Sequence, residues 1–153
     1  MNDHQLDTFV CSAHQSLLIA ILFGCASLAN SSDQQVVTPD PQAVAVATQW
    51  LTWVDAGNYE VAHRNLAARV RAGDPENEKQ WIAHLQTRRA PLGLPTSRTL
   101  VRTRFSRTML GGPDGNYEFL DYKTSFQYKE QGGETVILTK ESGQWQVSGY
   151  EFK

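Results

Sequence analysis

The sequence is poor in cysteine, and both of its cysteines, Cys11 and Cys25, lie within the first 29 residues. The rest of the chain therefore has no thiol from which a disulfide framework or a cysteine-ligated zinc site could be built. A chain of 153 residues, of which 41% are hydrophobic, is long enough to fold around one buried core without such support. The sequence predicts one globular domain.

The chain also has little net charge. It carries 14 Lys and Arg against 16 Asp and Glu, and loss of a leader containing Asp3 and Asp7 would leave 14 of each sign. A domain that is close to neutral lacks the strongly basic surface on which nucleic-acid binding depends. We therefore expect no nucleic-acid partner.

Charge is absent from Ser16 to Ala29, an apolar run of the length found in the central region of secretion signals and too short for a comfortable membrane span. The segment before it has no Lys or Arg, although such signals normally begin with a basic stretch. We interpret residues 1–29 as a signal peptide. The protein is then exported and periplasmic, or held at a membrane.

Two cleavage sites fit this segment. Ser27-Leu28-Ala29 places small residues before the cut, whereas Leu22-Phe23-Gly24-Cys25 resembles a lipoprotein motif that would end the leader at residue 24 and leave a lipid on Cys25. In the second case Cys25 would attach the protein to a membrane. Residues 30–40 form a polar spacer in both cases, and 41–153 form the domain.

Three helices are expected after the spacer. Asp40-Pro41 and Asp74-Pro75 each pair an N-cap carboxylate with a proline in the first turn, and Asn58 can cap a helix between them. Apolar residues at helical spacing follow each of these signals. We predict helices over about 41–56, 59–73 and 75–90.

After Pro95 the apolar period changes from about 3.6 to 2, which predicts four antiparallel strands over about 98–109, 117–128, 134–140 and 144–152. The aromatic positions of the second strand change parity along it, which suggests a bulge near Leu120 or Asp121. Helices followed by such a sheet indicate an α+β fold, in which three helices pack on one face of a curved, cone-shaped sheet. The nuclear-transport-factor-2-like and cystatin-like folds share this arrangement and enclose a hollow.

The chain from about residue 50 to 152 resembles a known bacterial exported family. The resemblance rests on segments that include Val54-Asp55-Ala56-Gly57-Asn58-Tyr59, Arg88-Arg89-Ala90-Pro91-Leu92-Gly93, Pro113-Asp114-Gly115-Asn116-Tyr117 and Trp145-Gln146-Val147-Ser148-Gly149-Tyr150. The family is the domain of unknown function 4019. The resemblance implies the cone-shaped fold and export, and it implies no activity. Such folds often pair through open sheet faces, so a homodimer is also an expectation.

No catalytic motif is evident, but four residues are candidates for lining the hollow. His63 lies on the inward stripe of the second predicted helix and could act as a general base or pack as a core histidine. Asp121, Tyr122 and Tyr128 lie on or beside the second strand. Strand alternation predicts that Asp121 and Tyr122 point to opposite faces unless the bulge realigns them.

Arginine is concentrated where acidic residues are missing. Residues 79–113 contain no Asp or Glu, and Arg98, Arg102 and Arg104 are predicted on one face of the first strand. Arginine binds carboxylates and phosphates well, so this face could dock an anionic partner. It could equally be a solvated surface balanced by acids on neighbouring strands.

The domain has two histidines, His63 and His84, and no cysteine, so few of the usual zinc or iron ligands are present. We therefore predict no metal site and no cofactor. The sequence favours a non-catalytic domain that binds a protein or another envelope component. The alternatives are a small-ligand carrier that uses a pocket between helices and sheet, or an isomerase- or hydrolase-like enzyme that uses His63 or Asp121.

Overall fold

The computed structural model describes residues 38–72 and 75–153. The predicted signal peptide with Cys25, and the spacer as far as residue 37, lie outside the described residues. The elements are α1 (Pro41–Asp55), α2 (Tyr59–Arg64), α3 (Ala68–Arg71), α4 (Pro75–Arg89), a short 3-10 helix η1 (Ala90–Leu92), and strands β1 (Pro95–Ser106), β2 (Tyr117–Phe126), β3 (Lys129–Glu141) and β4 (Gln144–Phe152). The α+β order is confirmed.

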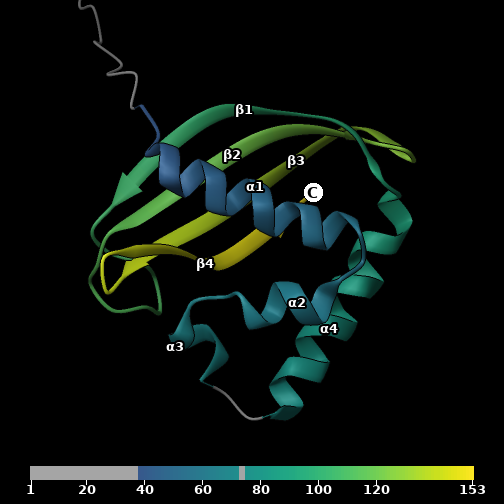
Figure 1. Cartoon of the computed structure of the whole chain (residues 1–153). Coiled ribbons are helices and arrows are strands. Elements are labelled where there is room, and N and C mark those ends of the chain that lie inside the picture. Colours follow the sequence, from purple (N-terminus) through teal and green to yellow (C-terminus); the bar gives the residue numbers. More distant parts are fainter. Residues whose placement is uncertain (1–37, 73–74) are drawn as a thin grey trace, which may run out of the picture. The chain divides into compact units, whose positions relative to one another are not determined.

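The first helix begins and ends where its sequence signals predict. The Asp40 carboxylate accepts the backbone N–H of Gln42, which satisfies one of the unpaired donors of the first turn. Gly57, just beyond the other end, has a φ of +74°, a conformation that glycine adopts without steric cost. α1 therefore has fixed ends, and it lies across one face of the sheet (Figure 1).

The helix predicted over residues 59–73 is instead two short helices, α2 and α3. Between them Leu66 forms a parallel bridge with Val147 of β4, and the backbone N–H of Ala67 donates to the carbonyl of Val147 at 2.7 Å. A backbone that pairs with a strand edge cannot keep helical hydrogen bonds at the same residues. The sheet edge therefore interrupts the helix.

The sheet is an antiparallel meander of four strands in the order β1-β2-β3-β4. One of its irregularities lies in β1, where Leu100 pairs with Tyr122 and Arg102 pairs with Asp121, so that Val101 is an extra residue. The bulge predicted near Leu120 or Asp121 is therefore in the partner strand. β2 alternates regularly at this point, and its aromatic residues simply occupy both faces.

The main core lies between α1 and the inner sides of β3 and β4. Trp50 is 1% exposed, meets Tyr150 edge-on at 5.2 Å between ring centroids, and donates its indole N–H to the carbonyl of Ala62. Trp145 is also buried, whereas Trp53 and Trp81 are partly buried at the margin of the core. The tryptophans thus serve mainly as core residues.

Candidate functional site

The hollow between helices and sheet is occupied by charged side chains. Asp55 ends α1, Arg89 ends α4, Arg98 comes from β1 and Glu134 comes from β3. The Glu134 side chain is 0% exposed and that of Arg89 is 4% exposed. We call these four residues the buried ion-pair cluster.

Arg98 is the centre of this cluster. Its guanidinium donates to both oxygens of Glu134, at 2.6 Å and 3.1 Å, and to both oxygens of Asp55, at 2.8 Å and 3.0 Å. The prediction that Arg98 shares a face with Arg102 and Arg104 is therefore wrong. The extra residue in β1 reverses the alternation between Arg98 and Arg102, so that Arg98 points inward.

Arg89 closes the cluster from the helix side. Its Nη2 donates to Oδ1 of Asp55 at 2.7 Å, and its Nη1 lies 3.6 Å from Oε1 of Glu134. The same guanidinium stacks over Phe126 at 4.8 Å from the ring centroid and lies 5.8 Å from that of Phe152. Such packing shields the charges from water and attracts the cation to the ring faces.

Glu134 receives two further hydrogen bonds, from the hydroxyls of Thr124 and Tyr150. Burial alone would raise the pKa of Glu134, but the donors from Arg98, Thr124 and Tyr150 outweigh burial and lower it. The carboxylate is thus ionised and its oxygens are already occupied by donors. It offers no free base for chemistry.

Tyr122 lies on the same inner face, 8% exposed, and its hydroxyl is buried without a hydrogen-bond partner. Burial raises its pKa to about 12. A phenol with this pKa stays protonated near neutral pH, so Tyr122 is a potential hydrogen-bond donor there and not a base. The inner face thus combines packing, ion pairs and the hydrogen bond from Tyr150 to Glu134.

Asp121 points to the outer face, as alternation predicts. Its carboxylate accepts from Arg102 Nε at 2.7 Å, from Arg104 at 3.2 Å and from the Thr135 hydroxyl at 2.7 Å. Burial would raise the pKa of Asp121, but these three donors lower it. Arg102 and Arg104 thus lie on one face, and each is balanced in part by the same acid.

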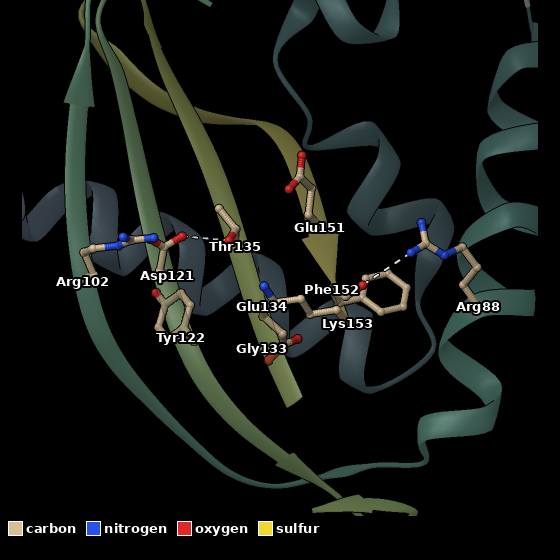
Figure 2. A pocket seen from close by; sticks show the side chains of 10 residues that line it. All are labelled: Arg88, Arg102, Asp121, Tyr122, Gly133, Glu134, Thr135, Glu151, Phe152 and Lys153. Atoms are coloured by element: carbon tan, nitrogen blue, oxygen red, sulfur yellow. Dashed lines mark hydrogen bonds and ion pairs between the residues drawn. The ribbon is translucent and has the colours of Figure 1, made fainter. Parts of the chain in front are cut away.

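A shallow basin of about 480 Å³ lies beside this group (Figure 2). Its lining includes Asp121, Thr135 and Glu151, the cluster member Glu134, and Phe152 and Lys153. Tyr122 also borders the basin. The hydrogen-bonding capacity of Asp121 is largely used by Arg102, Arg104 and Thr135, so the basin is a polar surface.

The other two candidates lie elsewhere. His63 is buried in the helix layer, where its ring lies 5.3 Å from that of Trp81 and its Nδ1 lies 3.6 Å from Glu78. Tyr128 is 71% exposed in the turn between β2 and β3, where it borders a second depression near Asp55. The structure therefore does not bring the four predicted pocket residues together.

The sequence reasoning missed three members of the cluster: Asp55, Arg89 and Glu134. Glu134 did carry a signal, because it has the same parity as Val136 on β3 and the structure buries both. An inward acid that stays ionised needs buried hydrogen-bond donors or a cation as its partners. Which cation serves could not be inferred, since Arg89 and Arg98 come from other elements.

In the part of the chain that the structure describes, no group of three or more His, Cys, Asp or Glu side chains is arranged as metal ligands would be. Within the same residues, no helix is long and apolar enough to cross a membrane.

The two edges of the sheet differ. The free side of β4 is covered at Val147 by Leu66 and Ala67. β1 pairs with β2 on one side, and among the described residues nothing is bridged to its other side. Figure 1 shows β1 at the margin of the sheet. This edge is 12 residues long, and Val101 and Phe105 on it are 60% and 50% exposed.

Comparison with known proteins identifies a family. Residues 46–150 match the family model "Protein of unknown function (DUF4019)". A crystal structure described as a "putative NTF2-like transpeptidase" from Campylobacter jejuni is similar, with a TM-score of 0.48 and 12% sequence identity over 72% of this chain and 99% of that chain. No curated protein matches the sequence.

Proposed function

Because the chain belongs to the family of unknown function DUF4019, whose description gives no activity, we propose a function from its own geometry. The domain is a non-catalytic binding module, and it docks an extended acidic segment of another protein along the free edge of β1. One observation carries this proposal: mutually paired charges, the buried ion-pair cluster, lie between the helices and the sheet, whereas the β1 edge is open. Side chains that already satisfy one another leave little for a bound ligand to pair with, which favours this function over a carrier or an enzyme.

The edge offers main-chain binding. A strand with one unpaired side presents a row of N–H and C=O groups, and an extended segment can pair with these groups as an additional strand. β1 is long enough for such pairing, and the described helices leave its free side uncovered, since α1 packs on β3 and β4. Binding through the backbone requires no enzyme-like pocket.

Charge determines the class of partner. The side chains of Arg102 and Arg104 are 65% and 45% exposed, and one carboxylate, Asp121, serves both. Two guanidinium groups that share one carboxylate leave a local positive charge on this side of β1. Glu or Asp side chains on the incoming strand would complete these pairs.

Apolar contacts add affinity. Val101 and Phe105 are exposed large hydrophobic residues on the same strand as the arginines. Their burial by a partner would remove apolar surface from water, which is the main favourable term in most protein association. The expected partner therefore combines acidic and apolar side chains along one extended segment.

A second copy of this chain fits the edge less well. Two β1 edges paired with each other would bring arginines of one copy close to arginines of the other, and like charges across a strand pair are destabilising. The homodimer expected from the resemblance is therefore the alternative outcome of the test.

The test uses a short peptide of alternating Glu and Val as the partner, with a Lys and Val peptide as its control. We expect the acidic peptide to shift the amide resonances of β1 and to slow their hydrogen exchange. The double variant Arg102→Gln/Arg104→Gln should weaken binding by about 10-fold or more. Arg64→Gln, which changes an exposed arginine on α2, should leave it unchanged.

Equal binding of both peptides, or shifts confined to residues away from β1, would contradict the proposal. A stable dimer that excludes the acidic peptide would show that a second copy occupies the edge. Light scattering of the free protein distinguishes this outcome.

We also propose that the domain works outside the cytoplasm, on the strength of the apolar run Ser16–Ala29. The two cleavage sites, after residue 24 and after residue 29, remain alternatives. If Cys25 carries the lipid, the Cys25→Ser protein should move from the membrane fraction to the soluble fraction, and the intact mass should fall by that of the lipid. Export would be contradicted if the native protein kept the mass of the full, uncleaved chain and was found in the soluble fraction.

A further inference from the structure

A groove of about 420 Å³ lies on the other side of the domain, where α1, the α2–α3 connection and the beginning of β4 meet. Its walls combine a flat aromatic surface with amide and guanidinium groups. They include an indole, three glutamine amides and two guanidinium groups: Trp53, Gln49, Gln144, Gln146, Arg64 and Arg71. The β1 edge takes no part in it.

Trp53 provides an apolar wall. It is partly buried against the core, so its ring is held in place while some of its surface stays accessible. The indole N–H groups of Trp50 and Trp145 donate to Ala62 and Asp40, whereas that of Trp53 has no acceptor among the described residues. Trp53 thus offers both a flat surface and a free donor.

The amides provide hydrogen bonds to hydroxyl groups. Gln49 lies four residues before Trp53, on the same face of α1, and Gln144 is exposed at the start of β4. Oε1 of Gln146 is buried and accepts no hydrogen bond within the described structure. A buried acceptor without a donor is costly, and a ligand hydroxyl would satisfy it.

The arginines provide positive charge. Nε of Arg71 donates to the Leu66 carbonyl, which fixes that guanidinium at the groove, and Arg64 is exposed on α2. Neither arginine has a carboxylate partner in the described part of the chain. Guanidinium groups that lack a partner favour a ligand with a carboxylate.

We propose that this groove binds a small acidic sugar. In this arrangement a sugar ring packs on the Trp53 indole, its hydroxyls bond to the glutamine amides, and its carboxylate binds Arg64 and Arg71. A purely apolar ligand would leave the amides without partners, and a bare anion would leave the indole unused.

The test compares glucuronic acid with glucose, because the two sugars differ in the carboxylate. We expect millimolar glucuronic acid to shift the indole N–H resonance of Trp53, and glucose to bind about 10-fold or more weakly. Arg64→Gln/Arg71→Gln should remove this preference, and added salt should reduce it. Arg102→Gln/Arg104→Gln is the matched control, with no expected effect on the Trp53 resonance.

Trp53→Phe should weaken the binding of both sugars while keeping the amide spectrum of a folded protein. Equal affinity for the two sugars, or no shift of the Trp53 indole resonance at concentrations of about 10 mM, would overturn the proposal. Because the β1 variants and the groove variants serve as controls for each other, failure of one proposal is distinguishable from failure of the other.

Discussion

Arg98 and Glu134, 36 residues apart in the chain, form a two-point ion pair inside the domain, with N–O distances of 2.6 Å and 3.1 Å. The Glu134 side chain has no exposure to solvent and that of Arg98 is 18% exposed. The pair is therefore formed in a region where an unpartnered charge is strongly unfavourable. It joins β1 to β3 across β2.

Removal of the Arg98 guanidinium should strongly destabilise the fold. We expect Arg98→Met to lower the free energy of unfolding by about 3–5 kcal/mol, because Glu134 would keep a buried charge without its main partner. Arg102→Met, on the exposed side of the same strand, should lower it by at most about 1 kcal/mol. Urea denaturation of both variants measures the difference. Similar losses for the two variants would contradict the central role of the Arg98 pair.

Two tyrosines of the inner face should respond oppositely to loss of their hydroxyls. Tyr150 donates to Glu134, so Tyr150→Phe should cost about 1.5–3 kcal/mol, the range for a hydrogen bond to a charged group. The Tyr122 hydroxyl is buried without a partner, so Tyr122→Phe should leave the stability unchanged or raise it. The check is the free energy of unfolding of each variant. A larger loss of stability for Tyr122→Phe than for Tyr150→Phe would contradict the view that the Tyr150 hydroxyl is paired and the Tyr122 hydroxyl is not.

Glu118 should give the domain an unusual pH dependence. It is fully buried, burial raises its pKa above the ordinary value of 4.5, and its Oε1 accepts the backbone N–H of Asp40. A carboxyl with a raised folded-state pKa contributes fully to stability below the ordinary value, and this contribution is lost as the pH rises through the raised pKa. Glu118→Gln should therefore increase Tm at pH 7 and have little effect at pH 4.

Glu134→Gln is the control for this pH series. The pKa of Glu134 is lowered, so its ionised form stabilises the fold above the ordinary value of 4.5 and loses that contribution as the pH falls through the lowered pKa. The variant should lower Tm at pH 7 and approach the wild type in acid. Parallel Tm profiles for the two variants would exclude this account.

Gly93, at the entry to β1, should tolerate no side chain. Its φ is +73°, and a Cβ there would lie 2.8 Å from Cβ of Gln127 and 2.9 Å from the ring of Tyr128. We expect Gly93→Ala to cost about 2–4 kcal/mol, from backbone strain and overpacking together. Gly143→Ala has a similar φ but open space around its Cβ, so it should cost about 1 kcal/mol. Thermal unfolding of the pair separates the two effects.

Much of the fold could be predicted from local signals. Asp40-Pro41 predicts the beginning of α1, and the glycine-rich breaks between the strands predict the order of the meander. These signals act within a few residues, so they can be recognised without knowledge of the rest of the chain. The split between α2 and α3 could not be predicted, because it depends on the distant edge of β4 at Val147.

The site was predicted less well, for a related reason. The face on which Arg98 lies depends on one extra residue in β1, and only pairing with β2 reveals that residue. The buried ion-pair cluster likewise joins Asp55, Arg89 and Glu134 from three separate elements. Periodicity reports which side of one element is apolar, and it carries no information about which charges meet.

The bridge between Leu66 and Val147 has a consequence for stoichiometry. A sheet with two open edges can recruit a strand on each side and so seed an indefinite fibre, whereas a sheet sealed along one margin can be extended in one direction only. In the proposed complex the sheet would therefore grow at the β1 edge, while the pairing at Val147 obstructs the β4 edge at that point. This arrangement favours a finite complex over an indefinite fibre.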